Sequence, residues 1–216
     1  MVWDDPGPRA ATIVPMERDT IYLVRHGETA WNTQGRLQGH LDSHLTAAGI
    51  GQAGEVGRAL RRLLPVGDAV TIETSDLGRA HRTAAIICAE LGLDPAAIVL
   101  EPLLREHSMG RWEGLTHGER DARFPGAREE RQRDQWHYVV PGGESYALAL
   151  GRAQQWLGAR RRTPITIAVT HEMMSRTIQA AYLGLSPADA LARAHGHREI
   201  VRLSEGASDE VAEEAR

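Results

Sequence analysis

Five short β-rich runs, separated by longer segments with helical periodicity, constrain the fold of this chain more than any other feature of its sequence. The β-rich runs lie at residues 20–24, 69–74, 98–100, 164–169 and 199–203. The helical segments lie at residues 46–64, 79–91, 144–161, 173–183 and 186–190. Strands that alternate with crossover helices predict an α/β fold, a three-layer α/β/α sandwich in which helices cover both faces of a mostly parallel sheet.

Residues 107–142 interrupt this alternation. The segment is polar and rich in arginine, and glycine and proline break it repeatedly. It is too long for a plain connection in a compact domain, so we expect a partly helical cap inserted into the fold. The sequence thus predicts one α/β domain over residues 20–204, with an N-terminal tail at 1–19 and a C-terminal tail at 205–216.

Lysine is absent from the sequence, and all 25 basic residues are arginine. This excludes P-loop proteins, which need a lysine for the phosphates, and enzymes that form a Schiff base on lysine. The net charge of −4 and the isoelectric point near 6.2 give no electrostatic reason to expect a nucleic-acid partner. Any anion must be bound by arginine, histidine or backbone N–H groups.

Neither a signal peptide nor a membrane-spanning segment can be recognised in the sequence. Residues 1–19 lack the apolar run of about 7–15 residues that a signal peptide contains. No segment approaches the roughly 20 apolar residues that a bilayer requires. The single cysteine, Cys88, cannot form an internal disulfide, which fits a reducing compartment. We expect a cytoplasmic protein without a membrane partner, and a homo-oligomer stays open.

Polar residues with phosphate-binding chemistry follow four of the predicted strands. Arg25 and His26 follow the first strand, Arg79 the second, Glu106 the third and His171 the fourth. Because ligands bind at the carboxyl ends of parallel strands, we expect these side chains to meet at one edge of the sheet. Such a cationic pocket with a single carboxylate suits a phosphoryl group, whose oxygens match the arginine fork.

Four motifs that contain these residues resemble, in the same order, those of the histidine phosphatase superfamily, in the branch related to phosphoglycerate mutase. They are LVRHGETAWN at 23–32, TSDLGRAHRTA at 74–84, LREHSMGRWEG at 104–114 and VTH at 169–171. The RHG tripeptide alone is a weak signal, whereas four ordered motifs over about 150 residues are a specific one.

The resemblance implies a role for each matched residue. His26 would be the nucleophile that forms a phosphohistidine. Glu106 would be the general acid that protonates the leaving oxygen and then activates water. The oxygens of the phosphoryl group would be surrounded by Arg25, Asn32, Arg79 and His171. Gln38 and Gly39 occupy a segment that resembles the family's substrate-contacting loop, and neither a metal nor a cofactor is implied. Taken singly, each residue also has an ordinary structural explanation as a surface charge, a cap or a structural histidine.

The form of the motifs favours hydrolysis over phosphoryl transfer between substrates. Dedicated mutases carry a longer insertion with lysine and tyrosine after an LNER form of the acid motif. This chain has LREH followed by GRWEGL, and PGGES at 141–145. We therefore expect a metal-independent, histidine acid-type phosphatase that hydrolyses a small phosphorylated metabolite. A mutase-type transfer and a non-catalytic phospho-ligand-binding module are the alternatives. A sugar phosphate, a glycerate derivative and a nucleotide-loop precursor all remain open as substrates.

One residue departs from the family pattern, in which glycine follows the final histidine. Glu172 takes that place. Its charge there would repel a phosphate dianion and raise the pKa of His171. Alternatively, Glu172 lies at a helix N-terminus and points away from the pocket, in a position where negative charge is favourable.

Other polar residues have simpler explanations. His195 and His197, like the pair His40 and His44, have spacings that metal ligands also show, but no set of carboxylates or cysteines accompanies them. We therefore expect solvated histidines. Of the six cap arginines, we expect most to be solvated and one or two to reach a second phosphate or a carboxylate. They are Arg111, Arg120, Arg123, Arg128, Arg131 and Arg133.

Overall fold

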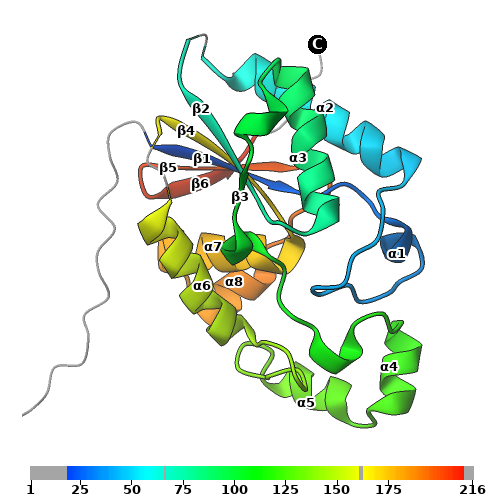
Figure 1. Cartoon of the computed structure of the whole chain (residues 1–216). Coiled ribbons are helices and arrows are strands. Elements are labelled where there is room, and N and C mark those ends of the chain that lie inside the picture. Colours follow the sequence, from blue (N-terminus) through cyan, green and yellow to red (C-terminus); the bar gives the residue numbers. More distant parts are fainter. Residues whose placement is uncertain (1–18, 66, 161–162, 212–216) are drawn as a thin grey trace, which may run out of the picture.

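Five predicted strands and a sixth form one sheet, in the order β3-β2-β4-β1-β5-β6 (Figure 1). The computed structural model of the protein describes residues 19–65, 67–160 and 163–211. Its strands are β1 (Thr20–Arg25), β2 (Val70–Thr74), β3 (Val99–Leu100), β4 (Ile165–Thr170), β5 (Ile200–Ser204) and β6 (Ala207–Glu210).

Four strands of the sheet pair in parallel, and the last two are joined to it by antiparallel pairing. β1 and β2 both pair in parallel with β4, and β3 pairs in parallel with β2. β5 is antiparallel to β1, and β6 is antiparallel to β5. The mostly parallel sheet is therefore confirmed. In its register, Arg25 of β1 lies opposite Thr170 of β4, so that His26 and His171 leave the sheet side by side.

Helices cover both faces of the sheet, as the sequence predicts (Figure 1). α2 (Ala47–Leu63) and α3 (Gly78–Leu91) lie on one face. α6 (Tyr146–Ala159) and α7 (Glu172–Leu183) lie on the other, with α8 (Pro187–Ala192) beside α7. Side chains alternate between the two faces of a strand. In β1, Val24 packs in the core cluster with α2 and α3, and Leu23 in the cluster with α6 and α7.

Capping residues fix the ends of these helices. Thr46 and Ser145 accept hydrogen bonds from backbone N–H groups in the first turns of α2 and α6. α3 and α7 end at Gly92 and Gly184, whose φ angles of 69° and 65° lie in the left-handed region that favours glycine. The predicted helices are present, and their bounds lie within two residues of the expected ones.

The C-terminal segment differs from the prediction. The sequence predicts a tail from residue 205, and this is wrong for its first part. Glu205 and Gly206, with φ of 51° and 74°, turn the chain after β5, and β6 returns along it. The four residues of β6, Ala-Ser-Asp-Glu, include no β-branched or aromatic side chain that would indicate a strand. Apart from Asp19, the predicted N-terminal tail lies outside the described residues.

The inserted cap contains α4 (His117–Arg123) and α5 (Ala127–Arg133). The 3₁₀ turns η1 (Pro95–Ala97), η2 (Pro102–Leu104) and η3 (Gly110–Trp112) precede them. The cap has a small core of its own, in which Met109 and Trp112 are buried. A backbone bridge between Arg36 and Thr116 joins the cap to the segment that follows α1 (Ala30–Thr33). The cap is therefore anchored close to the residues that follow β1.

Within the described residues, every helix falls short of the length or the apolar character that a membrane-spanning segment requires. Cys88 is buried between α3 and the sheet. The cytoplasmic location and the oligomeric state stay predictions.

Candidate active site

The predicted phosphate-binding residues meet at the edge of the sheet where β1 and β4 end. The rings of His26 and His171 lie 5.1 Å apart between centroids, and the two residues are 3% and 0% exposed. Burial lowers the pKa of both histidines and raises that of Glu106, and the charge of Arg79 acts on all three groups. The structure thus brings together side chains from all four motifs of the sequence.

His26 presents one free ring nitrogen to this pocket. Its Nδ1 lies 2.8 Å from the carbonyl oxygen of Gly27. Because a carbonyl only accepts, Nδ1 carries the proton, and Nε2 keeps its lone pair in the neutral ring. Burial, reinforced by the charge of Arg79, holds the pKa of His26 well below its usual value. The ring is therefore neutral at physiological pH and can act as a nucleophile through Nε2.

The glycine of the RHG motif is required by a close backbone contact. A Cβ atom on Gly27 would lie 2.3 Å from the carbonyl oxygen of Gly49 in the first turn of α2. A Cβ atom on Gly49 would lie 2.1 Å from the carbonyl oxygen of Glu28. Helix α2 therefore packs directly on the segment that carries His26, and only glycine fits at this contact.

His171 has one ring nitrogen without a partner. Its Nε2 lies 2.9 Å from Ser75 Oγ, and that oxygen also accepts from the backbone N–H of Leu77. Its Nδ1 is buried and has no hydrogen-bond partner among the described residues. Burial lowers the pKa of His171 well below its usual value, contrary to the rise expected from Glu172. If the Ser75 hydroxyl donates to Nε2, Nδ1 carries a proton that can be donated to a phosphate oxygen.

Glu106 lies at the N-terminus of α7. Its carboxylate accepts hydrogen bonds from the backbone N–H groups of His107, Met173 and Met174, at 3.0, 3.3 and 3.0 Å. Burial raises its pKa, although these hydrogen bonds and the charge of Arg79 oppose the rise. A carboxyl group with a raised pKa keeps its proton to a higher pH than an ordinary glutamate, which suits a group that donates a proton and takes one back.

Two further residues hold the backbone of Glu106. His40 Nε2 and Arg152 Nη2 donate to its carbonyl oxygen at 2.9 and 3.3 Å. Arg152 is itself paired with Glu144, whose carboxylate also accepts from the N–H of Ser108. Glu144 belongs to the PGGES segment, so this segment positions the acid motif through Arg152. The sequence did not assign this role to His40 or Arg152.

Arg79 is fixed by the loop at residues 39–42. Its Nη1 donates to Leu41 O at 2.8 Å and to Asp42 Oδ1 at 3.0 Å, and its Nη2 donates to Gly39 O at 2.8 Å. Its Nε is buried without a partner among the described residues. The side chain is 1% exposed, so Arg79 is a core residue of the site rather than a surface charge.

Arg25 shares Glu172 with a second arginine. Its Nη1 donates to the carbonyl oxygen of His195 at 3.0 Å and lies 3.1 Å from Glu172 Oε2. The other carboxylate oxygen of Glu172 accepts from Nη2 of Arg176. Glu172 is the first residue of α7, so its expected place at a helix N-terminus is confirmed. It does not point away from the site, because its carboxylate contacts Arg25, one of the predicted phosphate-binding residues.

Of the predicted substrate-binding residues, Asn32 lies in α1, and Gln38 and Gly39 lie in the loop that follows it. Asn32 Oδ1 accepts from the N–H of Thr29 in a capping box, while its amide nitrogen makes no hydrogen bond within the described chain. Gln38 is buried, and its Oε1 has no hydrogen-bond partner there. Gly39 has φ of +54°, and a Cβ atom on it would lie 2.3 Å from Glu113 Oε1. Asn32 thus ends the first motif, and Gln38 and Gly39 belong to the loop whose backbone holds Arg79.

The histidines of the C-terminal loop are not solvated, and the expectation for them is wrong. His195 is 1% exposed, with Nδ1 2.6 Å from Ser175 Oγ and Nε2 3.1 Å from Glu199 O, and burial lowers its pKa to about 4. His197 donates from Nδ1 to the carbonyl oxygen of His26 at 2.6 Å, and the two rings lie 5.6 Å apart. The HGH spacing indicates this pair, but only the antiparallel return of β5 brings it to the site.

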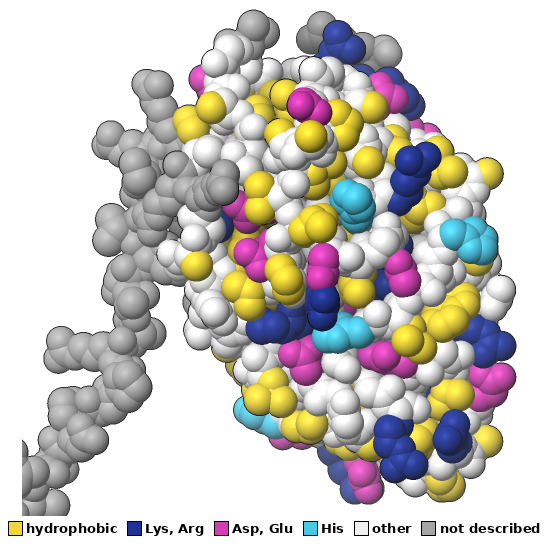
Figure 2. Space-filling model, in the orientation of Figure 1, with side chains coloured by type: hydrophobic (Ala, Val, Ile, Leu, Met, Phe, Trp, Pro, Cys, Tyr) yellow, Lys and Arg dark blue, Asp and Glu magenta, His cyan; other side chains and the backbone are white. Residues whose placement is uncertain are grey.

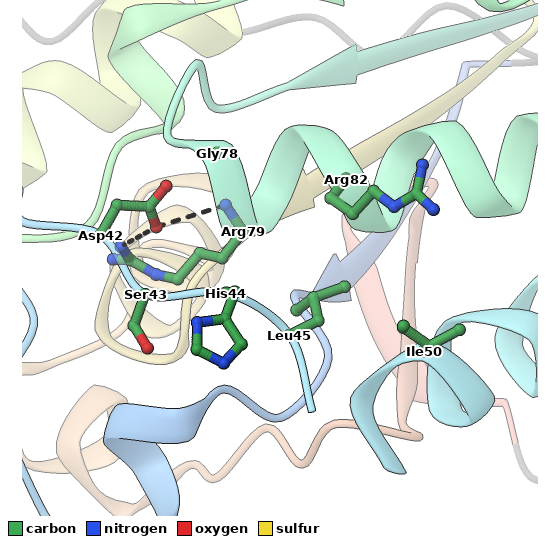
Figure 3. A pocket seen from close by; sticks show the side chains of 8 residues that line it. All are labelled: Asp42, Ser43, His44, Leu45, Ile50, Gly78, Arg79 and Arg82. Carbon is green, nitrogen blue, oxygen red and sulfur yellow. Dashed lines mark hydrogen bonds and ion pairs between the residues drawn. The ribbon is translucent and has the colours of Figure 1, made fainter. Parts of the chain in front are cut away.

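The other histidine pair does not form a metal site. His40 binds the Glu106 carbonyl, as described, and His44 is exposed. Across residues 19–65, 67–160 and 163–211, no three histidine, cysteine, aspartate or glutamate side chains are grouped so as to hold a metal ion. Figure 3 shows His44 in a pocket of about 530 Å³ between the loop at 42–45 and the first turns of α2 and α3. Its lining includes Arg79 but neither His26 nor His171.

The cap arginines divide as expected. Arg111, Arg123, Arg128 and Arg133 are exposed. Arg120 is buried, and its guanidinium pairs with Asp121 and lies 5.2 Å from the centre of the Trp112 ring. Arg131 is half-buried and makes no hydrogen bond or ion pair within the described residues. Both line a pocket of about 380 Å³, together with His117, Arg128, Gln132 and Gln135.

The face shown in Figure 2 mixes charges of both signs. Basic, acidic and histidine side chains gather in the middle of this face, between the sheet above and the cap below. The positive charges near the site are therefore provided by individually held arginines rather than by a broad basic patch.

Known proteins resemble this chain in both sequence and structure. The profile of the histidine phosphatase superfamily (branch 1) matches residues 21–214. A protein of Erwinia tasmaniensis named "Probable phosphoglycerate mutase GpmB" is 37% identical over 173 residues, which cover 79% of this chain and 77% of that protein. The glucosyl-3-phosphoglycerate phosphatase of Mycobacterium tuberculosis is 31% identical over 185 residues, covering 81% and 79%.

Among solved structures, mycobacterial glucosyl-3-phosphoglycerate phosphatase complexed with VO3 matches with a TM-score of 0.73 and 30% identity. The match covers 86% of this chain and 92% of that one. The strand ends that carry the two histidines thus belong to a shared fold. The chain is a member of the histidine phosphatase superfamily, branch 1.

Proposed function

We propose that this protein is a phosphomonoesterase that hydrolyses a small phosphorylated metabolite through a phosphohistidine on His26. The observation that carries the proposal is the state of His26, which is buried, neutral and free at Nε2. A carboxyl group with a raised pKa, Glu106, lies in the same site. A nucleophile and a proton donor are therefore both available for attack at phosphorus.

The reaction runs in two steps. In the first, Nε2 of His26 attacks phosphorus, the bond from phosphorus to the ester oxygen breaks, and Glu106 gives its proton to the leaving oxygen. In the second, the Glu106 carboxylate takes a proton from water, the water oxygen bonds to phosphorus, and the bond from Nε2 to phosphorus breaks. Inorganic phosphate leaves, and Glu106 is protonated again. The acid of the first step is thus the base of the second.

The remaining site residues stabilise charge on the three equatorial oxygens. Arg25 and Arg79 provide the positive charge. Within the described residues, the amide nitrogen of Asn32 makes no hydrogen bond and the buried Nδ1 of His171 has no partner, so both are available to donate. Preorganised donors of this kind stabilise a transition state without reorganising during the reaction. Metal independence is part of the proposal, because the arginines offset the charge that a cation would otherwise offset.

Hydrolysis of p-nitrophenyl phosphate in the presence of EDTA tests the proposal. We expect turnover between pH 5 and 8. When the reaction is quenched without acid, we also expect mass spectrometry to detect phosphorylated protein. His26→Ala should show neither. Turnover no higher than that of His26→Ala across this range would contradict an enzyme and favour a non-catalytic phospho-ligand-binding module. Activity that disappears in EDTA and returns with a metal would contradict metal independence alone.

Phosphoryl transfer between substrates is the second candidate, because one relative is named a probable phosphoglycerate mutase. The relative named a glucosyl-3-phosphoglycerate phosphatase favours hydrolysis, as do the short LREH–GRWEGL and PGGES segments of this chain. The two can be separated with 3-phosphoglycerate as substrate. Release of inorganic phosphate supports hydrolysis. Formation of 2-phosphoglycerate without release of phosphate would support the mutase.

The cap supports a finer proposal, that the leaving group carries a second anionic group. Arg131 is half-buried without a partner in the described chain, and burial together with the charges of Arg120 and Arg176 lowers its pKa. Half-burial removes part of the water around this unpaired guanidinium, and an anionic ligand would offset that loss. A panel of phosphomonoesters, matched with and without a carboxylate or second phosphate, tests this. Equal kcat/KM within matched pairs would contradict it.

A further inference from the structure

The environment of Arg25 contains a feature that hydrolysis alone does not require. Glu172 lies directly after His171, and its side chain is 34% exposed. One carboxylate oxygen lies 3.1 Å from Arg25 Nη1, and the other accepts from Arg176 Nη2. Its charge also acts on the rings of His195 and His197. The carboxylate therefore faces the site rather than the solvent side of α7.

We propose that Glu172 is a specificity-determining residue that weakens phosphate binding by competing for Arg25, and that Arg176 limits this competition by sharing the carboxylate. This rests on the proposed function insofar as Arg25 binds the phosphoryl group. The inference adds a role for Glu172 and Arg176, two residues outside the four motifs. It concerns the affinity for phosphate, not the chemical steps on His26.

The competition follows from the way in which Arg25 is held. Its side chain is 15% exposed, and its Nη1 is shared by the His195 carbonyl and Glu172. Its Nε is buried without a partner among the described residues. A phosphoryl group that binds this guanidinium through two oxygens must therefore displace the Glu172 carboxylate or lie close to it, and both groups are negatively charged. Either event lowers the affinity for the dianion.

The second cationic group of the site cannot remove this effect. Arg79 is already paired with Asp42 at 3.0 Å and bound to two backbone carbonyls. A phosphoryl dianion would thus bind two arginines that are each already paired with a carboxylate. A weakened grip on phosphate has a clear consequence for a hydrolase, because inorganic phosphate is its product and a tightly bound product inhibits turnover.

Arg176 makes the inference specific. Its Nη1 lies 3.3 Å from Tyr146 Oη, and its Nε is buried without a partner in the described chain. It lies one helical turn after Glu172, in the geometry of an i, i+4 ion pair. Removing Arg176 leaves Glu172 with Arg25 alone and so strengthens the competition. Removing Glu172 ends it. The two substitutions should therefore change phosphate affinity in opposite directions.

The test measures the Kd of inorganic phosphate by calorimetry and its Ki against p-nitrophenyl phosphate. For Glu172→Gln we expect both constants to fall about tenfold, as the loss of one nearby like charge implies. The KM for p-nitrophenyl phosphate should fall similarly, and kcat should change less than KM. For Arg176→Gln we expect both constants to rise. The double variant should resemble Glu172→Gln, because Arg176 acts through Glu172.

The control and the contrary outcomes are defined by the same measurements. Glu55→Gln removes a surface carboxylate whose partner is Arg198 at 2.5 Å, and it should leave Kd and Ki unchanged. Glu172→Ala provides a second variant, and the thermal unfolding transition of each verifies folding. A Kd that stays constant or rises in both Glu172 variants would overturn the inference. The inference would also be overturned if Arg176→Gln changed the Kd equally in the wild-type and Glu172→Gln backgrounds. That result would mean that Arg176 binds phosphate directly.

Failure of the proposed function would look different. If the protein binds phosphate but never turns over an ester, the activity assays fail while calorimetry still separates the Glu172 and Arg176 variants. If turnover is normal and the calorimetric constants do not move, only the role of Glu172 is wrong.

Discussion

Charged side chains are held differently at the edge of the sheet and in the cap. At the sheet edge the backbone holds them: Arg79 donates to two carbonyl oxygens, and the Glu106 carboxylate accepts from three N–H groups. In the cap, Arg120 pairs only with side chains, and Arg131 has no ion pair or hydrogen bond within the described residues. Backbone groups cannot be substituted, whereas side-chain partners can.

This difference separates two tasks. In the proposed function the sheet edge binds one group of fixed geometry, the phosphoryl group, and the backbone contacts hold Arg79 and Glu106 in place before that group arrives. The cap contributes a pocket of about 380 Å³ lined by side chains from two short helices. Changes at the edge should therefore affect the reaction itself, and changes in the cap should affect which ester is chosen.

The largest effect is expected from His26→Ala. Loss of the nucleophile removes the phosphohistidine route, so turnover should fall to the background rate. Steady-state hydrolysis of p-nitrophenyl phosphate measures it, with binding of inorganic phosphate as a control for an intact site. Residual turnover above about one hundredth of the wild-type rate would contradict the role of His26. Loss of a general acid alone lowers a rate by about a hundredfold, and loss of the nucleophile should lower it further.

Glu106→Gln should have the next largest effect, and the leaving group should set its size. For an alkyl phosphate, which needs its oxygen protonated, we expect kcat/KM to fall by about 10²–10⁴-fold. For p-nitrophenyl phosphate, whose phenolate leaves readily, formation of the phosphohistidine should be much less impaired, as rapid-quench kinetics can measure. Equal loss in the first step with both esters would mean that Glu106 does not donate the proton.

Arg131→Gln tests the cap. For esters with a second anionic group we expect KM to rise about tenfold, the loss of one ion pair in a partly buried setting, with kcat nearly unchanged. Esters without that group should be unaffected. Arg133→Gln is the matched control, since Arg133 is an exposed arginine of the same helix. An equal rise of KM for both classes of ester would place Arg131 in general phosphate binding.

The smallest effect on kcat is expected from lowering the pH to 5. An ordinary histidine with a pKa of 6.5 would be about 30-fold depleted in its neutral form at pH 5. Burial and Arg79 hold the pKa of His26 well below that value, so the nucleophile stays neutral as the pH falls. We expect kcat at pH 5 to remain within about threefold of its maximum. A tenfold loss between pH 6.5 and pH 5 would mean that His26 titrates normally.

The regular part of the fold could be predicted because each element carries its own signal. Short β-rich runs indicated the parallel strands, and 3.6-residue periodicity indicated their helices. The rule that ligands bind at strand ends then predicted that His26 and His171 lie together. The roles of the motif residues stay predictions until they are tested. Their placement at one edge follows from the parallel register of β1 and β4.

What the sequence did not reveal depends on contacts between distant segments. His195 and His197 reach the site because β5 returns antiparallel beside β1, and no local pattern encodes that proximity. The strand β6 follows a two-residue turn and is polar throughout most of its length. The sharing of Glu172 between Arg25 and Arg176 requires three-dimensional distances, although the departure from glycine was visible in the sequence.

The contact between Gly27 and Gly49 makes the nucleophile part of a larger cooperative unit. Since the first turn of α2 rests on the backbone beside His26, that backbone cannot separate from the sheet unless α2 moves as well. The N–H of Gly27 is also held, by Thr83 Oγ1 of α3 at 3.1 Å. In hydrogen exchange, this amide proton should therefore exchange only when α2 and α3 also unfold locally, and its exchange rate should be among the slowest in the chain.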